Sequence, residues 1–323
     1  VVPQSAARST AEHGPKYCRA RSEALPTTAV NKTVSRRRAT PPFFARHLLK
    51  YGDKAVFLQA ESSNNPIMNN LVKIVIPVYK PTLTRYEQIS LEQNCRILRH
   101  YPITFVKPEN LDVTPLLEKH PSIGIECFDD RYFQGIEGYN RLMTSPEFYE
   151  RFHEDCQYIL ICQLDAYVFR DELTTWCDKG YDYIGAPWLV RPRYRHPLLR
   201  FYRNLFRSAR TRATDFKVGN GGLSLRKVAS HLKATQALQG CIREYLSHAK
   251  NHVFNEDVFF SIEVNKHGMN FRYPDYREAL QFSFDKYPAL CFEMNQRQLP
   301  FGCHSWYKRQ MKDFWFPLIL PQH

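Results

Sequence analysis

One acidic side chain, Asp165, stands within the strongly apolar run of residues 158–169. The run reads YILICQLDAYVF, so Asp165 directly follows an expected buried strand, and apolar residues resume behind it. A carboxylate there loses its water, which costs several kcal/mol unless a cation or hydrogen-bond donors compensate. Ligands also bind at the carboxyl ends of strands in open α/β sheets. Asp165 is therefore a candidate for holding a metal–diphosphate group, with capping of the next turn as the alternative.

A pair of acids, Glu256 and Asp257, opens the helix that the sequence predicts over residues 256–266. The helix dipole favours the charged form of an acid at this end. A general base has to be ionised and within reach of a hydroxyl proton. The pair therefore suits a base that activates a hydroxyl, although acids at helix starts are commonly only caps.

One late histidine, His304, lies in the apolar, glycine-containing turn PFGCHSW at residues 300–306. A neutral imidazole is a good ligand for a divalent ion such as Mn²⁺. The alternative is a hydrogen-bonded histidine of the core.

Gly221 and Gly222 belong to the segment VGNGGLSLR at residues 218–226. Glycines let a backbone approach a ligand closely, and Ser224 could cap a helix that begins just after the segment. The spacing is neither that of a GxxxxGK[ST] loop nor that of a GxGxxG turn. We expect a glycine-rich turn beside a ligand here, with a plain flexible turn as the alternative.

An amide and a cation, Asn140 and Arg141, lie near the start of the helix predicted over residues 138–152. Such a pair suits recognition of a phosphate or of a nucleoside. A solvated arginine on a helix face is the plainer interpretation of this pair alone.

Short apolar runs alternate with helical patterns along the chain, which predicts an α/β fold with a mostly parallel sheet covered on both faces. Strands are expected at residues 71–78, 103–106, 123–128, 158–165 and 271–273. Helices are expected at residues 86–100, 138–152, 225–248 and 256–266.

The order of these motifs resembles that of GT-A-type glycosyltransferases, and within them most closely the β-1,4-galactosyltransferases. The segments QLDAYVF, YDYIGAPW, GNGGLSLRKV, NEDVFF and PFGCHSW also resemble a bacterial family thought to be glycosyltransferases. The resemblance extends from about Val72 to Trp306. It implies a GT-A-like single domain with a Rossmann-like central sheet flanked by helices.

The resemblance also implies ligands for the donor. Asp165 would face the diphosphate and a divalent metal, Mn²⁺ or Mg²⁺, with His304 completing the metal shell. Asn140 and Arg141 would contact the nucleotide. The first acid of the usual Asp-x-Asp is replaced by Gln163, which removes one charge that would face the cation.

The same resemblance implies the chemistry of transfer. Gly221 and Gly222 would line the pocket for the donor sugar and the acceptor. Asp257 would deprotonate the acceptor hydroxyl, and Glu256 would orient sugar hydroxyls. The implied activity is that of an inverting hexosyltransferase (EC 2.4 type) moving a sugar from a UDP-like donor to a glycan or lipid-linked acceptor in cell-envelope polysaccharide or glycoconjugate synthesis.

Charge is concentrated in two segments of this basic chain, whose net charge is +13. Residues 1–67 carry eleven Lys and Arg against four Asp and Glu, and residues 191–212 carry eight Arg and no acid. We expect residues 1–67 to be a disordered or non-native extension, with the functional protein beginning near Met68 and the transferase domain spanning 68–323. Nine cysteines without CxxC pairs favour a reduced, cytoplasmic protein.

The arginine-rich insertion at 191–212 contains helical spacing over residues 197–210. Its arginines are expected on one face and Leu198, Phe201, Tyr202 and Leu205 on the other. This pattern indicates peripheral contact with an anionic membrane on its inner side, or else a solvated helix docked on the core. No run reaches the roughly 20 apolar residues of a membrane span, and no nucleic-acid-binding module accompanies the charge.

Two other functions remain compatible with these residues. A catalytically inactive protein that binds a nucleotide sugar or a glycan would fit the amide at Gln163. A nucleotidyltransferase would also be an α/β protein with acids at strand ends, but the loop after the first expected strand lacks its Gly-rich, basic character.

Overall fold

Six strands form the central sheet of the computed structural model, which describes residues 71–191, 194, 196–206, 212–248 and 254–322. The strand order is β3-β2-β1-β4-β7-β6. Strands β3, β2, β1 and β4 run parallel, and β7 is antiparallel to both β4 and β6. The bounds are β1 Val72–Pro77, β2 Ile103–Pro108, β3 Gly124–Phe128, β4 Tyr158–Cys162, β6 Tyr183–Pro187 and β7 Val218–Lys227. The expected α/β class with a mostly parallel sheet is confirmed.

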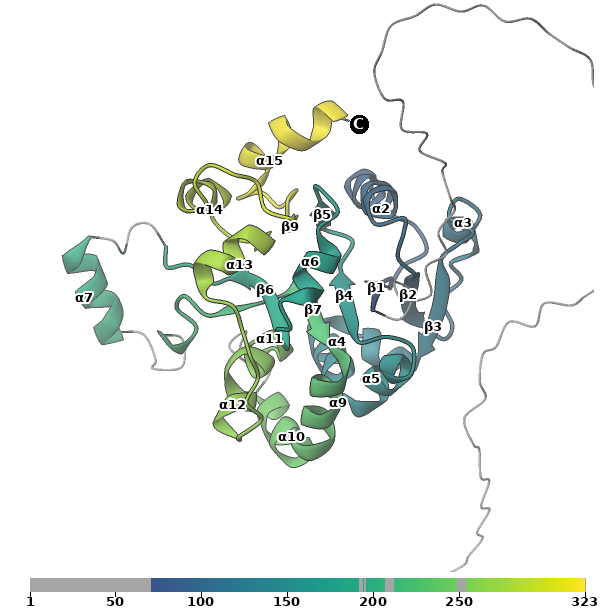
Figure 1. Ribbon diagram of the computed structural model, residues 1–323, viewed down its shortest axis with the longest axis horizontal. Coiled ribbons are helices and arrows are strands. Elements are labelled where there is room, and N and C mark those ends of the chain that lie inside the picture. Colours follow the sequence, from purple (N-terminus) through teal and green to yellow (C-terminus); the bar gives the residue numbers. More distant parts are fainter. Residues whose placement is uncertain (1–70, 192–193, 195, 207–211, 249–253, 323) are drawn as a thin grey trace, which may run out of the picture. The chain divides into compact units, whose positions relative to one another are not determined.

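Helices cover both faces of this sheet (Figure 1). Alternate residues of β1 point into two separate cores: Val72, Ile74 and Ile76 into one and Val75 into the other. The first core is closed by α2 Arg85–Ile97, α3 Thr114–Leu117, α6 Leu173–Asp178 and α13 Tyr276–Phe282. The second is closed by α4 Gly135–Met143, α5 Pro146–His153, α9 Val228–Ala237 and α10 Gln239–Ser247.

Local sequence signals fix where helices begin. Thr84 and Glu87 form a reciprocal capping box at the start of α2. The expected single helix over 138–152 is instead two helices, because Ser145 caps a new one and Pro146 occupies its first turn. A short 3-10 turn, η1 Asp130–Phe133, precedes α4.

A second, three-stranded sheet lies beside the first and has the order β5-β9-β8. Its strands are β5 Ala166–Val168, β8 Ser283–Phe284 and β9 Gly302–His304. An aromatic core that includes Tyr167, Trp306 and Trp315 packs it against α14 Pro288–Met294 and α15 Lys312–Ile319, which continues into η5 Leu320–Gln322. Pairing of Ala166 with His304 brings the two distant candidate segments together.

Four predictions about local structure are wrong. The glycine-rich segment is not a turn but part of β7, and Ser224 caps nothing, since its hydroxyl donates to the carbonyl of Gly221. The helix expected from residue 225 begins only at Val228, because the preceding residues pair with β4 and β6. Residues 271–273 form no strand.

The helix expected over 256–266 is built from three pieces. These are α11 Glu256–Val258, the π-helical turn η4 Phe259–Glu263 and α12 Val264–Lys266. A π-turn inserts an extra residue per turn and is frequent at functional sites. Here it follows directly on the acidic pair.

The predictions for residues 1–67 and for Met68 lie outside the described residues. Five cysteines, Cys156, Cys162, Cys177, Cys291 and Cys303, are buried with free thiols, as expected for reduced core residues. Among the described helices, none combines the length and apolarity that crossing a bilayer requires.

Candidate active site

Two cavities meet at Lys308, which lines both. The smaller one, about 480 Å³, lies where β1 and β4 end and is also lined by Pro77, Gln163 and Asp165. In the strand order, β1 has β2 on one side and β4 on the other, so this is the point where the sheet order reverses. Aromatic side chains form much of its wall: Tyr79, Tyr132, Phe133, Tyr139 and Tyr307.

The larger cavity, about 640 Å³, lies on the other side of Lys308. It is lined by Asp257, Asn220 and His304 together with Trp188 and Tyr194 from the segment between β6 and β7. Carboxylates, an imidazole and aromatic rings therefore all line this cavity.

Asp165 sits at the boundary of the two cavities between two cationic groups. Its Oδ1 lies 2.9 Å from His304 Nε2, and its Oδ2 lies 3.0 Å from Lys308 Nζ. Burial alone would raise the pKa of Asp165, but the charges and hydrogen bonds of His304 and Lys308 outweigh burial and hold it well below the usual range. Asp165 is therefore ionised at every physiological pH.

His304 is held from both sides by carboxylates. Its Nδ1 lies 3.1 Å from Asp285 Oδ1, and its Nε2 faces both Asp165 and, at 3.2 Å, Gln163 Oε1. Burial would lower the pKa of His304, but Asp165 and Asp285 outweigh it and raise the pKa to about 10. The imidazole is thus held in a fixed orientation and carries a positive charge.

Asp285 is a site residue that the sequence did not point to. It is buried, and its Oδ2 accepts a hydrogen bond of 3.1 Å from Asn220 Nδ2. Asn220 in turn accepts one from the backbone N–H of Gly222. The backbone of β7 therefore fixes Asp285, and Asp285 fixes the ring of His304. No motif announces Asp285, because it follows the short strand β8 in an ordinary SFDK sequence.

The two glycines of β7 are required by close packing. A Cβ on Gly222 would lie 2.1 Å from His304 Nε2, and a Cβ on Gly221 would lie 2.4 Å from Glu256 Oε1. Both distances are far below van der Waals contact. Gly221 and Gly222 thus let His304 and Glu256 approach the sheet rather than forming a flexible loop over a ligand.

Asp257 lies in the wall of the larger cavity and is half-buried. Its Oδ1 accepts a 2.7 Å hydrogen bond from the N–H of Val258. Burial and the neighbouring charge of Glu256 nevertheless raise the pKa of Asp257 well above its usual range. The expectation that the helix start holds this acid strongly ionised is corrected: α11 is one short turn, and burial outweighs it.

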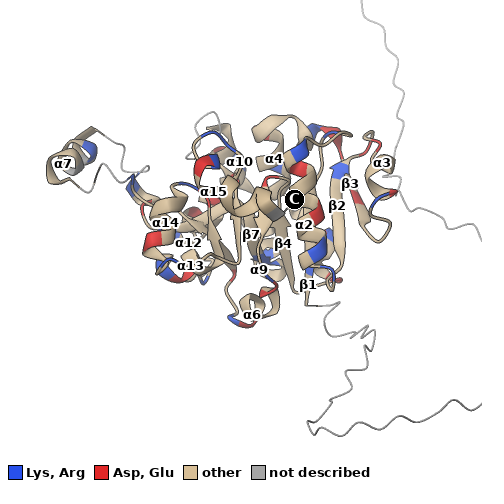
Figure 2. Cartoon of the chain, turned by 90° about the horizontal axis from the view of Figure 1, so that it is seen from above, with Lys and Arg blue, Asp and Glu red and all other residues tan. Residues whose placement is uncertain are grey.

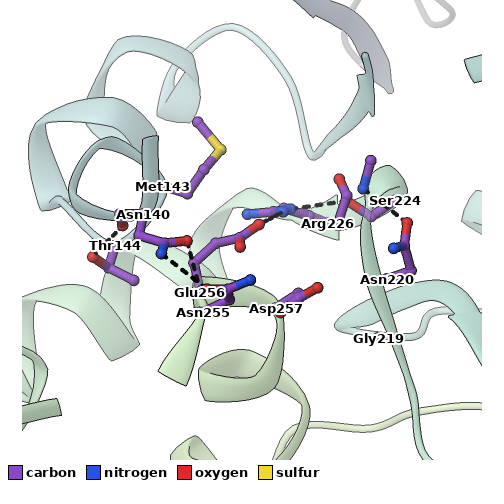
Figure 3. Close-up of polar contacts among 12 residues, drawn as sticks. Asn140, Met143, Thr144, Gly219, Asn220, Ser224, Arg226, Asn255, Glu256 and Asp257 are labelled. Atoms are coloured by element: carbon purple, nitrogen blue, oxygen red, sulfur yellow. Dashed lines mark hydrogen bonds and ion pairs between the residues drawn. The ribbon is translucent and has the colours of Figure 1, made fainter. Parts of the chain in front are cut away.

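Glu256 points the other way, into a buried polar network (Figure 3). Its Oε1 lies 2.9 Å from Arg226, whose side chain is fully buried and also donates to Tyr149 and Ser224. The backbone N–H of Glu256 donates to Asn140 Oδ1. Glu256 does not line either cavity, so its contact with sugar hydroxyls stays a prediction, and its observed contacts position α11 against β7.

Asn140 and Arg141 do not meet at the site. Asn140 is buried and binds Asn255 and Glu256, which fixes the start of α11. Arg141 is exposed on α4 and lines neither cavity. Their contact with a nucleotide stays a prediction.

The oxygens around His304 Nε2 suit a divalent cation only if it replaces the proton on this nitrogen and takes further ligands from a bound molecule. Asp165 Oδ1 and Gln163 Oε1 both face this nitrogen, and Asp285 holds the other ring nitrogen, as in many carboxylate–histidine–metal arrangements. Only one of the two oxygens carries a charge, and Lys308 occupies the second oxygen of Asp165. Within the described residues, no cluster of three His, Cys, Asp or Glu side chains could hold a metal by itself.

Comparison with known proteins gives one family match. The model of the family described as "Protein of unknown function (DUF5672)" matches residues 122–304, a span that ends at His304 and contains both Asp165 and Asp257. No curated protein matches the sequence.

Several solved structures resemble this fold at low identity. They include mouse xyloside xylosyltransferase 1 (14% identity, 72% of this chain and 96% of that chain, TM-score 0.45). They also include the glycosyltransferase GlyE of Streptococcus pneumoniae TIGR4 (14% identity, 78% of this chain and 63% of that chain, TM-score 0.42). A third is a glycosyltransferase involved in glycosylation of the major capsid of PBCV-1 (12% identity, 75% of this chain and 96% of that chain, TM-score 0.43). With TM-scores below 0.5, these likenesses do not establish the activity of this chain.

Proposed function

This chain belongs to the DUF5672 family, and we propose that it is an inverting glycosyltransferase that moves a hexose from a nucleotide donor, such as a UDP-sugar, to an acceptor hydroxyl. The observation that carries the proposal is the position of the Asp165–His304–Lys308 cluster between an aromatic cavity and a cavity that holds Asp257. A diphosphate at the cluster would link a nucleoside in the first cavity to a sugar in the second.

The aromatic cavity suits the nucleoside. Tyr79 and Tyr132 lie in its wall at the carboxyl end of β1 and before α4. Aromatic rings stack on nucleobases and contribute about 1–3 kcal/mol per base. Lys308 binds Asp165 and Ser305, but its side chain is 54% exposed, so it could turn toward an incoming diphosphate oxygen.

The reaction breaks the bond between the anomeric carbon and the diphosphate oxygen and forms one between that carbon and the acceptor oxygen. Lys308 stabilises the negative charge that develops on the departing diphosphate. Asp257 takes the proton of the acceptor hydroxyl. The acceptor oxygen attacks the anomeric carbon from the side opposite the departing diphosphate, which inverts that centre. Its raised pKa suits this role, because a base works best when its pKa approaches the working pH.

Asp165 and His304 would hold a divalent cation, Mn²⁺ or Mg²⁺, once the diphosphate supplies additional oxygen ligands. Such an ion would add positive charge where the diphosphate departs. The cation would have to replace the proton on His304 Nε2. Asp285 accepts from Nδ1–H and would keep that second proton on Nδ1, so that the Nε2 lone pair faces the cation.

We expect Mn²⁺ to increase the affinity for UDP, as measured by calorimetric titration with and without the ion. His304→Ala should abolish this increase. Asp285→Asn should raise the Mn²⁺ concentration that the increase requires by about 10–100-fold. His153→Ala, which changes an exposed histidine on α5, should leave it unchanged. An identical Mn²⁺ response in wild type and His304→Ala would contradict the assignment of these ligands.

The acceptor is a glycan or a lipid-linked molecule in this proposal, consistent with the aromatic wall formed by Trp188 and Tyr194 in the larger cavity. Cell-envelope polysaccharide or glycoconjugate synthesis on the cytoplasmic side is the context that we propose for it. The assay that tests the function is release of UDP from nucleotide sugars.

A further inference from the structure

Helix α7, Pro197–Phe206, turns its large apolar side chains to solvent. Of the eleven exposed large apolar side chains among the described residues, six lie on this helix, with exposed fractions between 44% and 77%. They are Leu198, Leu199, Phe201, Tyr202, Leu205 and Phe206. The other five are scattered over different elements. Contiguous exposed apolar surface of this kind marks an interaction site.

The arginine of α7 whose side chain the structure describes, Arg203, faces the protein. Arg203 is buried, pairs with Asp215 and lies over the ring of Tyr194, at 5.5 Å from its centroid. Leu198, Phe201, Tyr202 and Leu205 are exposed and Arg203 is buried, as separate apolar and basic faces predict for these residues. Arg207 and Arg210 lie outside the described residues.

Charge selects the partner of this apolar face. Residues 191–212 carry eight arginines and no acid, and the α7 ribbon in Figure 2 carries no red of an acidic residue. A second copy of the chain would bring a segment of the same charge, which disfavours self-association. Anionic lipid headgroups attract such a segment, while the apolar side chains enter the acyl boundary.

The α7 segment is also tied to the larger cavity. Backbone hydrogen bonds between Trp188 and both Phe216 and Lys217 join the two ends of the segment that carries α7. Arg203, Tyr194 and Asp215, which anchor α7, line the same cavity as Asp257.

We propose that α7 inserts into the headgroup region of an anionic bilayer and that the mouth of the larger cavity opens at this surface. The acceptor is then a lipid-anchored molecule whose hydroxyl reaches Asp257 from the bilayer. The identity of the acceptor rests on the proposed function, whereas binding to the bilayer does not.

Co-sedimentation of the full chain with vesicles tests the membrane contact. Wild type should bind vesicles of phosphatidylcholine with about one third phosphatidylglycerol, should not bind pure phosphatidylcholine, and should lose binding in high salt. Phe201→Ser with Leu205→Ser should weaken binding about a hundredfold. Leu318→Ser, an exposed apolar residue on α15, is the matched control and should bind as wild type does.

Tryptophan fluorescence tests where the cavity opens. Of the four tryptophans, Trp188 is half-buried and Trp176, Trp306 and Trp315 are buried. Vesicles that contain brominated phosphatidylglycerol should quench wild type, and the quenching should disappear in Trp188→Phe. Binding without quenching would separate the cavity from the bilayer and overturn the assignment of a lipid-anchored acceptor.

Two results would overturn the membrane contact itself. One is no binding of wild type to anionic vesicles at low salt. The other is a concentration-dependent dimer in sedimentation velocity that the Phe201 and Leu205 substitutions abolish, with vesicle binding unchanged. UDP binding measured on the same preparations separates the inferences, since it depends on the site around Lys308 and not on α7.

Discussion

Asp257→Asn should lower the rate of sugar transfer by about 10²–10⁴-fold while UDP binding stays unchanged. The amide keeps the shape of the side chain but cannot accept the acceptor proton. Asp257 lines the larger cavity and lies outside the aromatic one, so a nucleotide there loses no contact. Transfer kinetics and UDP calorimetry on the same preparation measure the two effects, and Asp313→Asn, which changes an exposed acid on α15, is the control. Loss of both properties, or of neither, would contradict the role of Asp257 as base.

The raised pKa of Asp257 gives the same variant two further signatures. The transfer rate of wild type should fall with decreasing pH at values well above the ordinary range of an aspartate, because only the ionised form accepts a proton. An acid whose pKa is higher in the folded protein than in the unfolded chain lowers the free energy of unfolding once the pH rises above its pKa in the unfolded chain. Asp257→Asn should therefore raise the melting temperature at neutral pH and not at pH 4.

Arg226→Met should be the most destabilising single change near the site. It leaves the buried carboxylate of Glu256 without its cation, and removal of one partner of a buried ion pair costs about 3–5 kcal/mol. For a domain of this size, that corresponds to a fall in melting temperature of roughly 10 °C. Thermal unfolding followed by circular dichroism measures it.

A double variant separates the ion pair from the packing around it. Arg226→Met with Glu256→Leu removes both charges and should recover much of the lost stability. Arg297→Met breaks the exposed pair with Glu293 and should change the melting temperature very little. A double variant as unstable as the single one would show that shape, rather than the unpaired charge, causes the loss.

The sequence predicted most of the parallel sheet because its strands are short β-branched runs bounded by clear helix starts. Tyr158–Cys162 followed by Asp165 could be placed at a strand end from apolar pattern alone, and the structure brings Asp165, His304 and Asp257 to adjoining cavities. The helical spacing of apolar residues and arginines in α7 also predicted an amphipathic helix.

Other features depend on contacts that sequence patterns do not encode. Gly221 and Gly222 looked like a turn because glycine disfavours strands. They instead continue β7 beyond its last pair with β4, between Leu223 and Cys162, and Glu256 and His304 approach them closely. Asp285 and Lys308 gave no motif, because their roles arise from the fold placing them beside a histidine and an acid. The raised pKa of Asp257 comes from burial, which outweighs the favourable helix start that the sequence suggested.

Release of UDP from a panel of nucleotide sugars, with and without Mn²⁺, tests the central claim most directly. We expect one donor to release UDP in the presence of a suitable hydroxyl acceptor or, more slowly, by hydrolysis, with Asp257→Asn inactive but still able to bind UDP. Binding of UDP without release by wild type would favour a nucleotide-sugar-binding protein. Neither binding nor release with any donor would contradict the account of the cluster around Asp165 as a diphosphate site.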